Sequence, residues 1–141
     1  MTADSADLGD GCFAHVDLTS AVIGQYFEVR KDLKPGYPEF VYREALVIAL
    51  SDAGMVVDRE VPVDVNFRGR RIAGFRLDLI VERVLVVELK AVTSLAAAHR
   101  DQLVNYLRCT DLELGLLLNF GPKAEVRRVA FSNDRKPGLR A

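Results

Sequence analysis

The sequence predicts an α/β domain in which a mixed sheet is flanked by helices. Two helix-like segments open the chain, several strand-like segments follow, and a third helical segment precedes the last two strands. This interleaved order is typical of a sheet covered by helices, and 141 residues suffice for one such domain. Half of the residues are apolar and 28% are charged, as in most globular chains.

The three helices are predicted from apolar stripes between helix-breaking residues. Residues 16–32 carry apolar side chains at helical spacing, and the Lys-Pro-Gly stretch at residues 34–36 ends that segment. A second helix is expected over residues 38–53, with Gly54 as its stop signal. Residues 94–109 predict the third helix.

The strands are predicted from alternation and from short apolar runs. Residues 61–67 alternate valine with other residues, and residues 114–119 resemble a strand buried on both faces. A flexible N-terminal arm is expected over residues 1–15, one domain over 16–131, and a fraying tail over 132–141. The expected strands cover residues 56–57, 61–67, 71–81, 84–90, 114–119 and 125–131.

Composition limits the range of functions. The net charge of −1 lacks the overall basic footprint of many nucleic-acid binders, although an enzyme with an acidic site and local basic clusters remains compatible with it. Cys12 and Cys109 fit no zinc or redox spacing, and we expect both to pack as small apolar groups in a reducing compartment. With no signal-peptide pattern and no membrane-length apolar run, a cytoplasmic location is the default expectation.

Three charged side chains interrupt two strand-like segments. Asp78 lies in the first segment, and Glu88 and Lys90 lie near the end of the next. An unpaired charge in an apolar layer costs roughly several kcal/mol, so these groups need a partner. A divalent metal ion with a phosphate would satisfy two acids and an ammonium. The alternative is that Glu88 and Lys90 merely lie on a solvated face of the sheet.

The connection between these two strands decides whether the charges meet. Glu88 and Lys90 are two residues apart and therefore share a face. A two-residue turn at residues 82–83 would leave Asp78 and Glu88 on opposite faces. A three-residue connection over residues 82–84 would instead pair Asp78 with Glu88. We predict this second register, with a bulge.

The chain resembles a known family through several motifs in a fixed order. Residues 36–43 read Gly-Tyr-Pro-Glu-Phe-Val-Tyr-Arg and fit the Gly-x-x-Glu-x-x-x-Arg pattern of the GxxExxxR proteins. These are small bacterial and archaeal members of the PD-(D/E)XK nuclease superfamily. The resemblance covers about residues 16–131. The other matching parts are Asp78, residues 87–92, residues 114–121, and the Gln-x-x-x-Tyr of residues 102–106, a pattern found in lambda-exonuclease-like members.

The resemblance implies a restriction-endonuclease-like core of the order αβββαβ, with the active site where the second and third core strands diverge. It further implies that Asp78, Glu88 and the carbonyl of Leu89 hold a metal ion. Lys90 resembles the lysine that orients or activates the attacking water.

Three further residues are assigned to the site by the same resemblance. Glu44 is placed like a helical glutamate that often contacts the metal through water. Gln102 and Tyr106 resemble a pair that supports the site and touches the DNA backbone, and their i, i+4 spacing directs both from one helix face. The alternative is a packed helix with a surface glutamine and a half-buried tyrosine.

Phosphodiester hydrolysis explains why these residue types belong together. The reaction needs a deprotonated water in line with the leaving oxygen and neutralisation of the phosphoryl charge. Hard oxygen ligands such as those of Asp78 and Glu88 suit Mg²⁺ or Mn²⁺, which acidify bound water. An ammonium such as that of Lys90 stabilises developing negative charge.

Two other charged groups have simpler interpretations. Glu39 and Arg43 are i, i+4 and predict an exposed ion pair at the start of the second helix. A basic patch near the third strand could follow a phosphate backbone or form a solvated hairpin tip. Its members are Arg68, Arg70, Arg71 and Arg76.

Taken together, these patterns predict a Mg²⁺- or Mn²⁺-dependent nuclease acting on DNA, with a second copy of the chain as a candidate partner. One alternative is a catalytically silent nucleic-acid-binding or scaffold protein with the same fold. Another is an RNA-directed component of a defence or mobile-element system.

Overall fold

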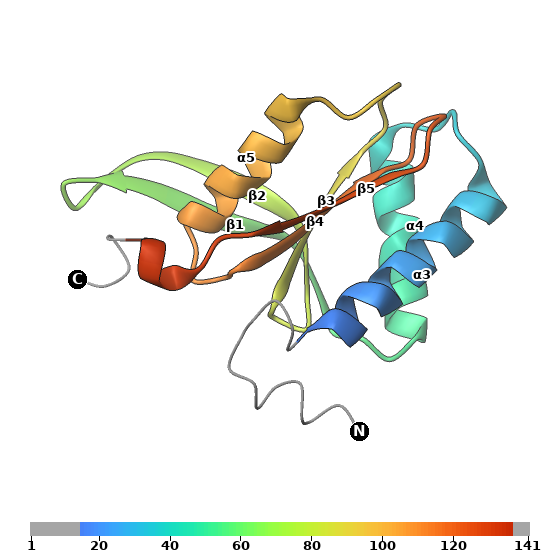
Figure 1. Cartoon of the computed structure of the whole chain (residues 1–141), viewed down its shortest axis with the longest axis horizontal. Helices are drawn as coiled ribbons and strands as arrows, with labels where there is room; N and C mark the ends of the chain where they lie inside the picture. Colours follow the sequence, from blue (N-terminus) through green and yellow to red (C-terminus); the bar gives the residue numbers. More distant parts are fainter. Residues whose placement is uncertain (1–14, 137–141) are drawn as a thin grey trace.

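A five-stranded sheet runs through the molecule, and helices cover both of its faces (Figure 1). The computed structural model describes residues 15–136. The helices are α3 (Val16–Leu33), α4 (Glu39–Asp52), α5 (Ala97–Arg108) and the short 3-10 helix η1 (Asn133–Arg135). The strands are β1 (Val57–Phe67), β2 (Arg70–Val81), β3 (Leu85–Lys90), β4 (Leu114–Asn119) and β5 (Glu125–Ala130).

The strands lie in the order β1-β2-β3-β4-β5. β1, β2 and β3 form an antiparallel meander, β3 and β4 run parallel, and β4 and β5 are antiparallel. A parallel pair needs a long crossover, which α5 supplies between β3 and β4. The predicted mixed α/β sheet is confirmed, and the elements from α4 to β4 have the order αβββαβ.

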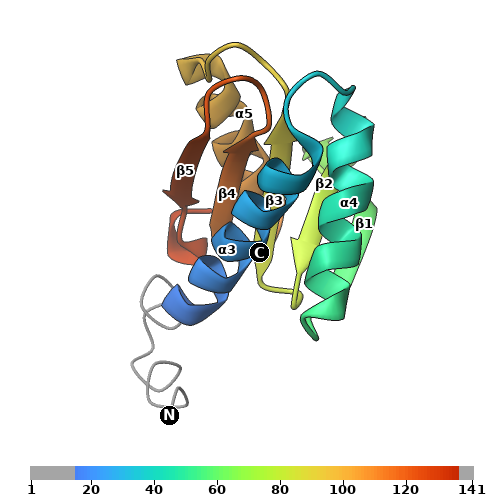
Figure 2. The same ribbon diagram turned by 90° about the vertical axis from the view of Figure 1, so that its right-hand side faces the viewer.

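Two apolar cores lie on the two faces of the sheet. The helices α3 and α4 pack on one face, where Val87 and Leu89 of β3 join their core (Figure 2). On the other face, α5 packs over a core that contains Val86. Side chains alternate along a strand, so Glu88 and Lys90 share the α5 face with Val86.

Tyr42 fixes the start of α4 against the sheet. Its hydroxyl donates to the carbonyl of Lys34 and accepts from the N–H of Tyr37 at 3.1 Å. Its ring stacks on Phe120, with ring centres 4.8 Å apart. Because Phe120 directly follows β4, these contacts anchor the first turns of α4, which begins with Glu39, near the carboxyl ends of the parallel strands.

β2 changes the face that it presents beside Asp78. Leu77 packs in the α5 core, whereas Leu79, two residues later, packs in the core of α3 and α4. Opposite this point, between the β1 partners of the two leucines, Glu60 has a left-handed backbone with φ of 51°. The regular alternation is thus broken at the position of Asp78.

The observed elements differ from the predicted ones at three places. The strands predicted over residues 56–57 and 61–67 are one continuous strand, β1. The third helix begins at Ala97 rather than at residue 94. Within the tail that was expected to fray, residues 133–135 form η1.

Lys136 explains why this part of the tail is ordered. Its side chain is buried and donates to the carbonyls of Thr110 and Leu112. Nearby, Cys109 is a half-buried free thiol. Cys12 and the predictions for residues 1–14 and 137–141 lie outside the described residues.

Candidate active site

Asp78 and Glu88 lie opposite each other where β2 and β3 separate. The regular pairing of the two strands ends at Leu79 and Val87, and residues 82–84 connect them. The predicted three-residue connection and its register are therefore confirmed. The predicted bulge is not there: the paired residues of β2 and β3 show no register shift, and the shift lies in the outer part of the β1–β2 hairpin.

Side-chain carboxylates replace the backbone ladder beyond this point. The N–H of Asp78 donates to Glu88 Oε1 at 2.9 Å, and the N–H of Leu89 donates to Asp78 Oδ2 at 3.0 Å. No hydrogen bond from residues 15–136 reaches the second oxygen of either carboxylate, Asp78 Oδ1 or Glu88 Oε2. Both acids are thus fixed by one oxygen and leave the other available.

The environment of Glu88 opposes its ionisation. Its side chain is only 5% exposed. Burial, followed by the negative charge of Asp78, raises the pKa of Glu88 to about 8, although the N–H of Asp78 and the ammonium of Lys90 act in the opposite direction. Two acids so close together in an apolar setting form a site that favours a cation.

Glu39 is a third carboxylate of this cluster. Burial and the charge of Asp78 raise its pKa, whereas Lys90 and Arg43 lower it. The predicted ion pair between Glu39 and Arg43 is wrong, because Arg43 Nε instead lies 3.3 Å from Glu44 Oε2.

Glu44, which the resemblance assigned to the site, is held by two arginines. It forms ion pairs with Arg43 and Arg59, at the contact of α4 with β1. Glu39 and Glu44 are five residues apart on α4, so their side chains differ in direction by well over a quarter turn about the helix axis. The sequence analysis took Glu39, the glutamate of the Gly-x-x-Glu-x-x-x-Arg pattern, as a structural residue, whereas in the structure it interacts electrostatically with Asp78 and Lys90.

The helix α5 brings two more predicted residues to the cluster. Lys90 Nζ donates to Gln102 Oε1 at 3.4 Å, a long contact. Burial and the charges of Glu88 and Asp78 raise the pKa of Tyr106, so its phenol stays protonated at neutral pH. The Tyr106 ring also stacks on Phe75, with ring centres 4.3 Å apart. Tyr106 is therefore both a packed residue of the α5 core and a neighbour of the two acids.

A family model described as the PD-(D/E)XK nuclease superfamily matches residues 16–129. The chain belongs to this superfamily. No curated protein and no solved structure matches the chain in the other two comparisons. Membership agrees with the observed core and makes this a candidate metal-dependent nuclease, since nucleases of the superfamily generally use divalent metal ions.

The donor set of this PD-(D/E)XK site fits a hard divalent cation. Asp78 and Glu88 each offer one oxygen, and the carbonyl of Leu89 points to the same edge of β3 as its N–H, toward Asp78. Within residues 15–136, no group of three or more His, Cys, Asp or Glu side chains could hold an ion unaided. Magnesium tolerates this because it keeps several of its waters.

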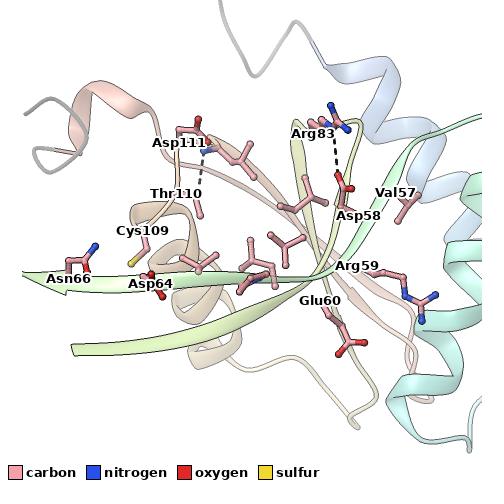
Figure 3. A pocket seen from close by; sticks show the side chains of 16 residues that line it. Val57, Asp58, Arg59, Glu60, Asp64, Asn66, Arg83, Cys109, Thr110 and Asp111 are labelled. Atoms are coloured by element: carbon pink, nitrogen blue, oxygen red, sulfur yellow. Dashed lines mark hydrogen bonds and ion pairs between the residues drawn. The ribbon is translucent and has the colours of Figure 1, made fainter. Parts of the chain in front are cut away.

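A groove of about 1030 Å³ is lined by other residues than these acids (Figure 3). It runs between β1 and the segment from Cys109 to Leu112, and neither Asp78 nor Glu88 lines it. Its charged lining residues are mainly acidic, which disfavours a phosphate ligand.

None of the helices in the described part of the chain has the length and apolar character needed to span a membrane.

Proposed function

We propose that this chain hydrolyses phosphodiester bonds in DNA with the help of Mg²⁺ or Mn²⁺. The observation that carries the proposal is the reciprocal arrangement of Asp78 and Glu88, each fixed by a backbone N–H and each with one oxygen available. Lys90 lies on the same face, and its positive charge acts to lower the pKa of both Glu39 and Glu88. A purely structural sheet has no need for a buried glutamate and a half-buried aspartate held against each other beside a lysine.

In this proposal Asp78, Glu88 and the carbonyl of Leu89 hold the metal ion directly, and Glu39 contacts it through water. When bound, the ion polarises the phosphate and acidifies a water molecule. The contacts favour Glu39 over Glu44 for the helical position. Glu44, held by its two arginines, would join α4 to β1.

The remaining residues orient and stabilise the reacting groups. The ammonium of Lys90, held by Gln102, is placed to orient the attacking water and to stabilise charge on the phosphate. The protonated phenol of Tyr106 is a hydrogen-bond donor for a phosphate oxygen. Its stacking on Phe75 limits the directions in which it can donate.

We also propose that the chain belongs to a narrower group within the superfamily. The Gly-x-x-Glu-x-x-x-Arg motif at residues 36–43 supports membership of the GxxExxxR proteins, and Gln102 with Tyr106 supports the lambda-exonuclease-like branch. On this basis the protein acts in a prokaryotic cytoplasm. A homodimer would enlarge the surface available to DNA.

The test is cleavage of linear, nicked and circular DNA, and of RNA, with Mg²⁺, with Mn²⁺ or with EDTA. We expect metal-dependent cleavage of DNA that Lys90→Met abolishes. Metal binding by calorimetry without cleavage of any substrate would instead indicate a scaffold, and cleavage confined to RNA would contradict the DNA assignment.

A matched pair of variants separates the two helical glutamates. Glu39→Gln should reduce the rate by about 10-fold or more, because it removes a carboxylate beside Asp78. Glu44→Gln should leave the rate within about twofold and change mainly the stability. The reverse result would restore Glu44 to the role that the resemblance implied.

A further inference from the structure

The outer half of the β1–β2 hairpin stands away from the rest of the molecule (Figure 1). We call residues 64–76 the basic arm. Residues 66–74 are exposed without exception, on both strands and on both faces. Val63 and Phe75 are the outermost residues of the hairpin that pack against the α5 core. A two-stranded ribbon of this kind is marginally stable alone, so a partner that covers it would stabilise it.

The charge of the basic arm is opposite to that of the rest of the chain. It holds four arginines and one aspartate, a net of +3, in a chain whose net charge is −1. Asp64 pairs with Arg71 at 2.8 Å. Arg68, Arg70 and Arg76 make no ion pair with any residue of the described part of the chain. These three free guanidinium groups are suited to phosphates.

The tip of the basic arm also exposes two large apolar side chains. Phe67 is 57% exposed and Ile72 is 65% exposed. The Arg68 guanidinium lies over the Phe67 ring, 4.9 Å from its centre. Nucleic-acid-binding ribbons use such apolar groups against base edges and thymine methyls, between arginines that contact phosphates.

We propose that the basic arm is a second contact with duplex DNA, remote from the carboxylates. This deepens the proposed nuclease function and rests on it. β2 leads directly from Asp78 to Arg70, and eight residues of strand span roughly 26 Å. That distance corresponds to about eight base pairs of duplex. The major groove admits a two-stranded ribbon, and the free arginines can contact the phosphates that border it.

The experiment uses fluorescence anisotropy with three labelled probes: a duplex of about 30 base pairs, a duplex of about 6 base pairs, and a single strand of about 30 nucleotides. All proteins carry Glu88→Gln, so that DNA is not cut. The arm variant adds Arg68→Ala and Arg70→Ala. The control adds Arg128→Ala instead, which removes an exposed arginine from β5 at the other edge of the sheet.

For the long duplex, the arm variant should bind at least about 10-fold more weakly, and the slope of log affinity against log salt should fall by about 2. The Arg128→Ala control should have the same affinity and the same salt slope as the parent protein, which carries only Glu88→Gln. The short duplex cannot reach both sites, so it should bind the arm variant and the parent equally. Phe67→Ala should weaken binding to the long duplex without changing the salt slope, because it removes no charge.

Several outcomes would overturn the assignment. An unchanged salt slope, or an equal loss with the short duplex, would show that the arm contributes no remote phosphate contact. A loss seen only with single-stranded DNA would assign the arm to that ligand instead. Sedimentation showing that Phe67→Ala dissociates a dimer, with DNA binding unchanged, would make the arm an interface between copies. If the parent binds no DNA at all, the nuclease proposal itself fails.

Discussion

Two glutamates of this chain expose equally little surface to solvent and yet behave in opposite ways. Glu88 and Glu125 are each 5% exposed. Burial and the charge of Asp78 raise the pKa of Glu88 to about 8, whereas a hydrogen bond from the N–H of Leu95 is the largest of the effects that lower the pKa of Glu125. Burial alone therefore does not identify a functional acid.

The surroundings of Glu125 satisfy its negative charge. Its Oε1 accepts from the N–H of Leu95 at 2.8 Å and from Asn119 Nδ2 at 3.3 Å. Its Oε2 lies 3.3 Å from Arg127 Nη2 and 3.8 Å from Lys123 Nζ. With two cations and two neutral donors, Glu125 needs no further partner.

The Glu125 cluster supports the site through the segment that follows Lys90. Asn119 bonds both the N–H and the carbonyl of Val92. A side chain at Gly121 would bring its Cβ to 1.8 Å from the carbonyl oxygen of Val92, so only glycine fits there. These contacts fix the chain between Lys90 and α5, which carries Gln102 and Tyr106. One buried acid thus stabilises the part of the structure that carries the other, the proposed metal ligand.

The largest expected contrast is between Glu88→Gln and Glu125→Gln. Glu88→Gln should lower the cleavage rate by at least about 10³-fold, since it removes a ligand of the ion. It should also raise the metal-free Tm near neutral pH, because a neutral amide folds without the proton uptake that Glu88 requires there. Glu125→Gln should lower the Tm and leave the rate per folded molecule largely unchanged. Calorimetry and initial rates measure both quantities.

This contrast is contradicted if both substitutions lower the metal-free Tm by the same amount and if the two variants cleave DNA at the same rate. Such a result would mean that Glu88, too, is a satisfied structural acid. Asp101→Asn, which changes an exposed residue on α5, serves as a control for nonspecific charge effects.

The second contrast is in the pH dependence of metal-free stability. The pKa of Glu88 is raised from 4.5 to about 8, so the folded state holds a proton that the unfolded state releases. Its stabilisation is complete below pH 4.5 and is lost as the pH rises to about 8, a change on the order of a few kcal/mol. The pKa of Glu125 is lowered, so its stabilisation is present above 4.5 and is lost as the pH falls through its folded pKa.

Urea unfolding from about pH 2 to pH 9 measures this effect, because the Glu125 change lies below pH 4.5 and the Glu88 change lies between pH 4.5 and about 8. In Glu88→Gln the loss of stability toward pH 8 should be much smaller, with Glu39, whose pKa is also raised, supplying part of what remains. In Glu125→Gln the loss on the acidic side should shrink instead. Identical pH profiles for the two variants would refute the opposite assignments.

The sequence predicts the part of this site that lies on the strands better than the part that lies on the helix α4. The two-residue period of strands and a three-residue connection sufficed to place Asp78, Glu88 and Lys90 on one face. The choice between Glu39 and Glu44 requires the orientation of α4, and the sequence assigned Glu44 only through the resemblance. The apolar pattern did not reveal that orientation, since Phe40 and Ile48 are exposed.

The Glu125 cluster and the basic arm were beyond reach for different reasons. Leu95 is 30 residues from Glu125, and Asn119 is its partner on the neighbouring strand β4, so the cluster depends on strand pairing and chain packing that no periodicity reveals. The arginines of the arm were visible as a patch. Their projection from the body depends on where the α5 core ends, at Phe75, and this follows from packing rather than from local sequence.

The third contrast is in the response to metal. Mg²⁺ or Mn²⁺ should neutralise the pair of Asp78 and Glu88 and raise the Tm, with a stabilisation of about 2.7 kcal/mol when the ion is present at about 100 times its Kd. The shift should persist in Glu125→Gln and vanish in Glu88→Gln. A shift of equal size in both variants would place the ion elsewhere. Thermal denaturation with and without EDTA gives the comparison.

The smallest expected effect is that of Tyr106→Phe. The ring keeps its stacking on Phe75, so stability should change little, and the loss of one donor to a phosphate oxygen should slow cleavage by about 10-fold, or about 1.4 kcal/mol. The loss should appear in kcat rather than in the Tm. Tyr37→Phe, which alters an exposed tyrosine before α4, is the matched control. A Tyr106→Phe enzyme with full activity would show that the phenol only packs, so that α5 would contribute Gln102 alone to the chemistry.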